Sequence, residues 1–203
     1  PPFIATLGTQ YLFLGAAFIW TDGRVLSIPS KNFRALTNGS LGFLPYVFLT
    51  LAVVAALTWV VLFRSEFGRQ LRAIGSNERA AQLAGVGVNA TRIAAFAIAG
   101  ALFALAGAFL AGRLSSAEGN MSIGVEMGVI AAVVVGGTSL RGGRGTVLGV
   151  ILGAILFAWL ANALNMLGVA SYWQYVVTGS VLAAAVALGV RSSRQAAIRG
   201  KRW

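Results

Sequence analysis

The chain has 203 residues, of which 58% are hydrophobic and only 10% are charged. Soluble domains carry roughly 25% charged residues, so this composition excludes an ordinary soluble protein and requires a surface that faces lipid. The chain has no Cys and no His and only five acidic residues, which excludes disulfides, His-based catalysis and the usual metal sites.

Apolar runs long enough to cross a bilayer recur along the chain. A helix needs about 20 mainly apolar residues to span the hydrocarbon core. Such runs occupy residues 3–20, 43–63, 93–112, 147–167 and 173–190. They predict an all-α, polytopic bundle of membrane helices, with about six transmembrane segments when the shorter run described next is included.

The shorter run, residues 127–140, is expected to form a short or discontinuous helix. It has too few residues to cross the membrane comfortably, and Gly136 and Gly137 near its end are poor helix formers. Broken helices are tolerated at membrane depth only where protein or water covers the exposed backbone. A full crossing and a partly buried helix both remain open.

Basic residues are concentrated on one side of the predicted bundle. Cytoplasmic loops of membrane proteins retain Lys and Arg. If residues 64–92 are cytoplasmic and 127–140 crosses the membrane, twelve of the sixteen basic residues lie inside. We therefore expect a cytoplasmic loop at 64–92 and a basic cytoplasmic tail at 191–203. The net charge of +11 is then explained by the basic cytoplasmic loops, and no nucleic-acid partner is expected.

The polar segment 64–92 predicts a short helix outside the bilayer. A turn signal at residues 75–77 supplies Ser or Asn as a helix cap, and Glu78 follows in the first turn. The next residues are rich in Ala, and Gly85 ends the helix. A short, smooth helix of this kind suits a groove on a soluble partner, although connectors often look the same.

Small and polar residues mark the membrane segments near the carboxyl end. Gly145, Gly149 and Gly153 stand four residues apart, a spacing that lets helices pack closely. Asn162 and Asn165 lie near the predicted outer end of the same run, and Gln174 begins the next run. These amides would either contact a translocated substrate or bond to each other and to backbone. Asn162 and Asn165, together with Glu126, the acidic residue closest to the membrane, are the candidates for a translocation path.

The polar segment resembles the cytoplasmic coupling segment of the ribose, xylose and arabinose type of ABC transporter permease. The family pattern runs roughly G-R-x-x-x-A-x-G-x-N-x-x-A-A-x-x-x-G. It matches here at Gly68, Arg69, Ala73, Gly75, Asn77, Ala80, Ala81 and Gly85. The resemblance implies that these residues, with Glu78, dock on an ATP-hydrolysing subunit and pass its motion to the membrane helices.

A second resemblance covers residues 126–145, EMGVIAAVVVGGTSLRGGRG. The family pattern is similar to E-L-D-x-I-A-A-V-V-x-G-G-T-S-L-x-G-G-x-G, and this chain departs from it at Gly128, where an acidic residue is usual. Further matches are PPFIATLGT at the start, RLSSAEG at 113–119 and NALNMLGV at 162–169, with Ala163 in place of Gly. The resemblance therefore extends over nearly the whole chain.

The resemblance implies a single permease domain over residues 1–203 that lacks the first few of about ten membrane helices. The expected function is a permease subunit, in the bacterial inner membrane, of an ATP-driven importer for a pentose or related monosaccharide. The implied partners are two ATP-binding cassette ATPase subunits, an extracytoplasmic sugar-binding protein, a second permease subunit (homodimer or heterodimer) and membrane lipid. Neither a cofactor, a metal ion nor a catalytic residue is expected on this chain.

Three other functions are weighed against this one. A branched-chain amino-acid permease of the same architecture is the nearest alternative. An ATP-independent secondary transporter usually needs ionisable residues deep in the membrane, and only Glu126 comes near it. A membrane-embedded enzyme is disfavoured by the lack of Cys and His and by the scarcity of acids.

Overall fold

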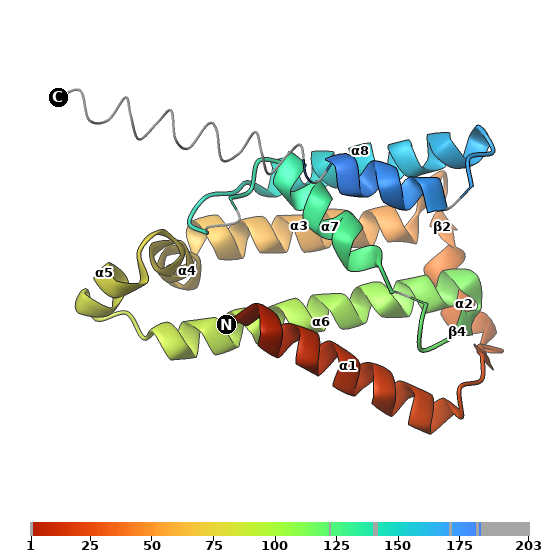
Figure 1. Ribbon diagram of the computed structural model, residues 1–203, viewed down its shortest axis with the longest axis horizontal. Coiled ribbons are helices and arrows are strands. Elements are labelled where there is room, and N and C mark those ends of the chain that lie inside the picture. The colour runs from red at the N-terminus through yellow and green to blue at the C-terminus, as the bar shows by residue number, and fades with distance from the viewer. Residues whose placement is uncertain (1, 122, 140–141, 171, 182, 184–203) are drawn as a thin grey trace. The chain divides into compact units, whose positions relative to one another are not determined.

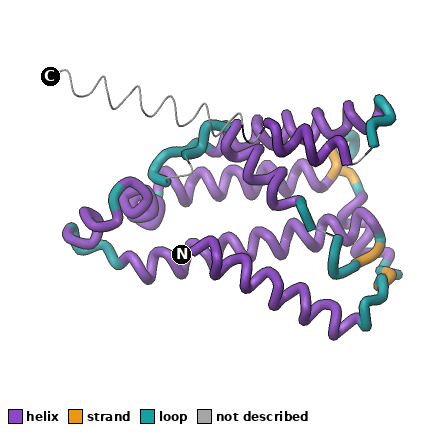
Figure 2. Tube along the Cα trace, viewed as in Figure 1, coloured by secondary structure: helices purple, strands orange, loops and turns teal. Residues whose placement is uncertain are grey.

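The structure, a computed structural model, describes residues 2–121, 123–139, 142–170, 172–181 and 183, which are mostly helical (Figures 1 and 2). Among them, four helices are long and apolar enough to cross a membrane: α1 (Pro2–Thr21), α3 (Tyr46–Arg64), α6 (Val88–Leu114) and α8 (Val147–Met166). Each coincides with one of the predicted apolar runs. The prediction of a helical membrane bundle is confirmed, and the chain is a multi-pass membrane protein.

The shorter run forms α7 (Val125–Val135), a helix of 11 residues that ends at Gly136. The predicted short helix is therefore confirmed, while its full crossing of the membrane stays a prediction. Residues 172–181 are also helical. Most of the remaining predicted run at 173–190 and the whole basic tail at 191–203 lie outside the described residues.

The segment 64–92 contains two helices where the sequence predicted one. They are α4 (Glu66–Ser76) and α5 (Glu78–Leu83). The sequence pattern hid α4 because it contains Gly68 and Gly75, and glycine weakens helices. Its cap is nevertheless clear, since the Ser65 hydroxyl accepts a hydrogen bond from the Gly68 N–H at 3.1 Å.

The described chain divides into two compact units. One consists of Pro1–Leu57 and Ile93–Ile123. It contains α1, the helix α2 (Lys31–Asn38) and four strands of two residues each: β1 (Leu26–Ser27), β2 (Ser40–Leu41), β3 (Leu44–Pro45) and β4 (Ser116–Ala117). Strand β1 pairs antiparallel with β4, and β2 with β3.

In this first unit, α2 packs tightly on the end of α6. Thr37 of α2 is only 3% exposed, and a Cβ on Gly112 of α6 would overlap its side chain. The Asn38 amide donates a hydrogen bond to the Gly112 carbonyl at 3.1 Å. Glycine at 112 therefore allows the polar helix α2 to close over this end of α6.

The other unit consists of Thr58–Arg92 and Gly124–Trp203. Within it, α4 packs on α5 and α7 packs on α8. The buried side chains of its described part are small, as expected where helix backbones approach closely: Ala81, Val88, Thr91, Ala131 and Ala132. All the residues that the sequence predicted for coupling, translocation and helix packing belong to this unit.

Candidate functional site

Helix α4 is joined to the end of α3 by a tight backbone contact. Gly68 is buried, and a Cβ there would overlap the carbonyl oxygens of Val61 and Leu62. The Arg72 guanidinium reaches back over the Phe63 ring, with 4.9 Å between its central carbon and the ring centroid. Helix α4 thus follows α3 without a flexible linker, so the two helices are mechanically connected.

Helix α4 is also attached to the beginning of α6. The Thr91 hydroxyl, only 5% exposed, donates to the Gln70 side-chain oxygen at 3.1 Å. Nearby, Glu78 of α5 pairs with Arg92 at 2.8 Å, and these side chains are 50% and 40% exposed. Exposed pairs of this kind contribute about 1 kcal/mol or less. The Thr91 hydroxyl also lies 3.0 Å from the Gly87 carbonyl, so its single proton is shared between two acceptors and this connection is modest too.

A single residue separates α4 from α5. The Asn77 N–H donates to the Ala73 carbonyl at 3.0 Å and ends α4, while its side-chain oxygen accepts from the Ala80 N–H at 3.1 Å and begins α5. Of the two predicted caps, Asn77 is therefore the one that caps. Helix α5 stops at Leu83, and Gly85 follows in a left-handed conformation with φ of 83°.

The residues predicted to contact an ATPase fall into two groups. Arg69, Asn77, Glu78, Ala80 and Gly85 are exposed. Gly68 and Ala81 are buried, and Gly75 is half-buried, so these three face the interior of the chain. The most exposed apolar side chain of α5 is Leu83, at 87%, which the sequence pattern had not singled out.

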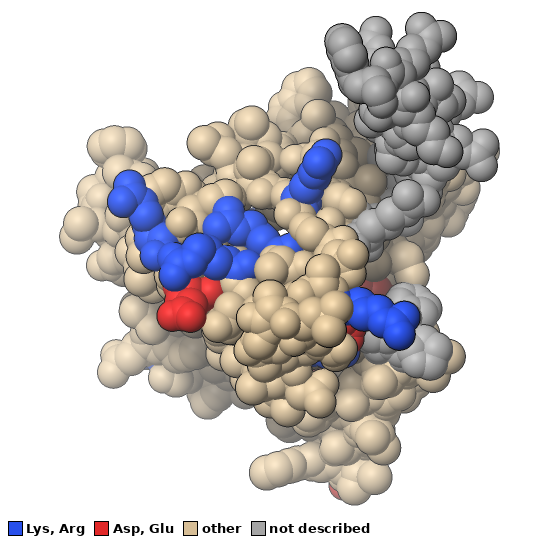
Figure 3. Space-filling model, turned by 90° about the vertical axis from the view of Figure 1, so that its left-hand side faces the viewer, with Lys and Arg blue, Asp and Glu red and all other residues tan. Residues whose placement is uncertain are grey.

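The face that carries α4 and α5 is rich in basic side chains (Figure 3). Five arginines belong to residues 58–92, against Glu66 and Glu78, which are the acidic residues of that stretch. The exposed Leu83 therefore lies on a helix surrounded by positive charge. An apolar anchor with a charged rim is typical of a surface that docks a protein partner.

Helices α7 and α8 pack backbone against backbone. A Cβ on Gly149 would overlap the Gly136 carbonyl oxygen, and one on Gly153 would overlap that of Ala132. Gly145 precedes α8, and a Cβ there would lie 3.0 Å from the Thr138 side chain. The predicted glycine ridge thus meets α7 at two positions and the loop after α7 at the third.

The three candidate translocation residues do not come together in one site. Glu126 accepts a hydrogen bond from the Gly124 N–H at 2.9 Å and so caps its own helix. The Asn162 amide faces the Met166 sulfur at 3.8 Å. Asn165 accepts from the Gln174 amide at 2.7 Å, which links α8 to the helical residues 172–181.

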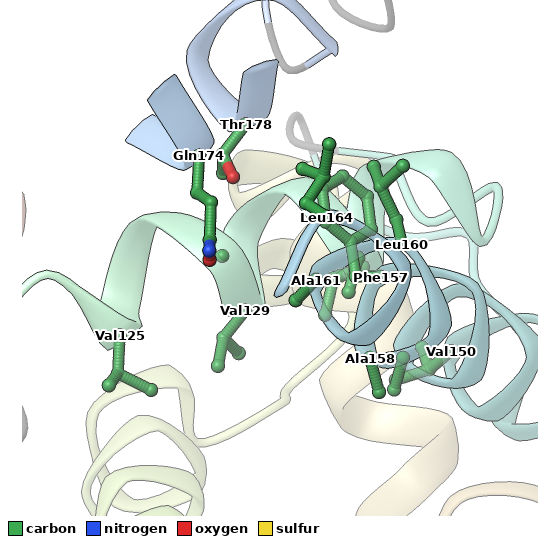
Figure 4. Close-up of a pocket in the computed structure, with 14 residues that line it drawn as sticks. Val125, Val129, Val150, Phe157, Ala158, Leu160, Ala161, Leu164, Gln174 and Thr178 are labelled. Carbon is green, nitrogen blue, oxygen red and sulfur yellow. The ribbon is translucent and has the colours of Figure 1, made fainter. Parts of the chain in front are cut away.

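A cavity of about 410 Å³ lies between α7, α8 and the helical residues 172–181 (Figure 4). Its wall is mainly apolar, with side chains such as Val129, Phe157 and Leu164. Gln174 and Thr178 are its polar groups. Gln174 therefore connects the cavity to Asn165, and this bond is one of the two alternatives that the sequence left open for these amides.

The similarities of the chain identify its family. Residues 1–186 match the family described as "Branched-chain amino acid transport system / permease component". The chain belongs to this permease family. No solved structure matches the chain significantly.

Among the relatives of this permease are three bacterial sugar-import proteins. The ribose import permease protein RbsC of Bacillus subtilis is 41% identical over 95% of this chain and 60% of the relative. The galactose/methyl galactoside import permease protein MglC of Haemophilus influenzae is 39% identical over 92% of this chain and 58% of the relative. The L-arabinose transport system permease protein AraH of Escherichia coli is 41% identical over 90% of this chain and 56% of the relative. The chain thus spans about three-fifths of the length of these relatives.

Within the described part of this permease, no three His, Cys, Asp or Glu side chains gather closely enough to hold a metal ion. Its helices form the following arrangement. A pair of short helices with an exposed face is tied to two long apolar helices, beside a glycine-packed helix pair that lines a cavity.

Proposed function

We propose that this chain forms the membrane-spanning core of a permease subunit in an ATP-driven importer of the bacterial inner membrane, and that the substrate is a monosaccharide. The proposal for the sugar rests on the relatives, whose names give ribose, galactose or methyl galactoside, and arabinose. Residues 64–92 act as a cytoplasmic coupling segment in this proposal. ATP is hydrolysed on separate partner subunits, and this chain carries no catalytic residue.

The observation that carries the proposal is the exposed face of α5 combined with its fixed attachment. Leu83 and the polar residues beside it offer a docking surface, whereas Ala81 on the opposite side of the same short helix is buried. Because Gly68 seats α4 on α3 and Thr91 bonds to Gln70, a push on α5 is passed to both α3 and α6. A flexible connector would absorb the push.

The proposed cycle needs partners on both sides of the membrane. Two ATPase subunits close on ATP and displace α4–α5 of each of two permease subunits, in a homodimer or a heterodimer. A sugar-binding protein delivers substrate on the outer side. The membrane helices then alternate between outward and inward access, with Glu126, Asn162 and Asn165 as the proposed polar contacts along the path.

The first test removes the apolar anchor on α5. We expect Leu83→Asp to reduce co-purification of the ATPase subunits and sugar uptake by at least tenfold, because a buried carboxylate at an interface core is costly. Leu41→Asp is the matched control, since Leu41 is also an exposed leucine, at 66%, but lies in β2 of the other unit. Equal ATPase binding by both variants would contradict the proposal.

The substrate class is tested by uptake assays with labelled ribose, arabinose, galactose and leucine in cells that produce the permease with its partners. We expect ATP-dependent uptake of a sugar and none of leucine. Leucine uptake would instead favour the amino-acid type of permease that the family description names. Uptake that persists without ATP would favour a secondary transporter.

A further inference from the structure

The turn that follows α7 touches the end of α4 through backbone atoms and the Ser76 hydroxyl. Gly75 lies in the last turn of α4, and a Cβ there would overlap the amide nitrogen of Gly143. From the other side, a Cβ on Gly142 would lie 2.9 Å from the Gly75 carbonyl oxygen, and one on Gly143 would lie 3.0 Å from the Ser76 nitrogen. We refer to these four residues, 75, 76, 142 and 143, as the glycine contact.

The turn is shaped to make this approach. Gly142 and Gly143 have φ of 88° and 77°, left-handed values that residues with a side chain adopt only with strain. The Ser139 N–H donates to the Arg144 carbonyl at 3.0 Å, and the Gly142 N–H donates to the Ser139 carbonyl at 3.0 Å. These bonds close the turn on itself and present its two glycines to α4.

The same turn is anchored to α7 at its start and to α8 at its end. At its start the Gly136 N–H bonds to the Ala132 carbonyl at 2.9 Å, and Gly136 packs against Gly149 of α8. At its end the Thr146 hydroxyl caps α8 by accepting from the Gly149 N–H at 3.1 Å. A displacement of the turn therefore moves α7 and α8 together, and these helices line the cavity of Figure 4.

We infer that the glycine contact is a second transmission route, which carries the movement of α4 directly to α7 and α8. The inference rests on the proposed function, because it supposes that a partner moves α4–α5. A side chain between two helices can change its rotamer and absorb a small shift, whereas touching backbones cannot. The absence of side chains at 75, 142 and 143 is thus what makes the transmission stiff.

The test exploits the fact that Gly75 lies in a helix. Alanine is a better helix former than glycine, so Gly75→Ala favours α4 itself while its methyl group collides with Gly143. We expect normal membrane insertion and ATPase binding, with sugar uptake per ATP hydrolysed reduced at least tenfold. Gly87→Ala is the matched control, because its Cβ would meet nothing closer than the Ala90 Cβ at 4.0 Å. It should couple normally.

A second measurement reports on the contact without relying on transport. The chain has no native Cys, so the double variant Ser76→Cys, Arg144→Cys places one thiol on each side of the contact at exposed positions and replaces no glycine. A short bifunctional thiol reagent should link the two positions in most molecules in membranes, and adding Gly75→Ala should reduce the linked fraction at least threefold. Failure of the double variant to link while Gly75 is retained would overturn the inference, even if Gly75→Ala proved too unstable to assay.

The two proposals fail in different ways. If the unchanged permease neither binds an ATPase subunit nor imports a sugar, the proposed function is wrong and this inference falls with it. If binding and uptake are normal but Gly75→Ala also couples normally, only the glycine contact as a transmission route is refuted. A loss of ATPase binding in Gly75→Ala would likewise refute it, by placing Gly75 in the docking surface itself.

Discussion

Adjacent alanines in α5 have opposite environments. The resemblance to the coupling segment assigns Ala80 and Ala81 the same role, but Ala80 is exposed and Ala81 is only 4% exposed. A helix of six residues has one face toward the chain and one toward solvent, so neighbours are separated by about 100° around the axis. Ala81 therefore acts through packing, and Ala80 is the residue available to a partner.

This difference predicts opposite outcomes for one substitution at two positions. Ala81→Leu should overfill a closed site, and over-packing costs about 1–3 kcal/mol. We expect its thermal unfolding temperature in detergent to fall by several degrees. Ala80→Leu should leave that temperature unchanged and instead weaken ATPase binding. Equal unfolding temperatures for the two variants would show that Ala81 is not buried in the protein.

Gly68 and Gly75 show the same principle within α4. Both match the coupling pattern, yet Gly68 accommodates carbonyl groups of α3 and Gly75 accommodates the turn at Gly143. Neither contributes a side chain to a partner, because glycine has none. Their place in the pattern reflects close backbone approach inside the chain, and the exposed contacts are left to neighbours such as Arg69 and Leu83.

At the scale of elements, α7 and α8 depend on small residues at their crossing. Membrane helices gain little from hydrophobic burial against each other, since lipid is equally apolar, so they associate through close packing. Gly149 and Gly153 supply it by meeting Gly136 and Ala132. The cavity beside them is lined by larger side chains, such as Phe157.

A leucine substitution tests this crossing. A Cβ at position 153 would by itself overlap the Ala132 carbonyl, so Gly153→Leu should separate α7 from α8 and destabilise the protein by about a few kcal/mol. We expect a smaller fraction of this variant to remain monodisperse after heating in detergent. Gly128→Leu is the control, since a Cβ at Gly128 of α7 meets nothing within 4 Å. Equal heat stability of the two variants would argue against the observed packing.

For the whole molecule, the orientation in the membrane is the prediction on which the function depends. The charge asymmetry of the sequence predicts that residues 64–92 lie in the cytoplasm and residues 21–42 outside. Helices α1, α3 and α6 have no buried residue in their most apolar stretches, as expected of surfaces that face lipid or other membrane helices. The coupling role of α4–α5 requires the cytoplasmic side.

Thiol labelling tests this orientation directly, because the chain has no native Cys. Asn32→Cys in α2 and Arg79→Cys in α5 each introduce one thiol at an exposed position. A membrane-impermeant maleimide should label the α2 variant in intact cells and the α5 variant only after the membrane is opened. Labelling of the α5 variant in intact cells would show that the topology is the reverse of the predicted one, and it would rule out α4–α5 as a cytoplasmic coupling surface.

The sequence by itself determined the membrane class, the long helices and a helix cap at Ser76 or Asn77, because apolar run length and capping chemistry are local properties. The family also followed from local sequence, through short motifs in a fixed order. It did not determine α4, whose glycines look like helix breakers until α3 and the turn at Gly143 are in place around them.

Only the tertiary structure decided which motif residues face inward and which side chains remain exposed. Whether Ala81 is covered, or whether Gly75 meets Gly143 some 68 positions away, depends on contacts between segments distant in the chain. Such contacts are set by the packing of whole helices and leave no periodic signal in either segment alone. For the same reason the exposure of Leu83 became visible only in the folded chain, and only the structure decided that Asn165 bonds to Gln174.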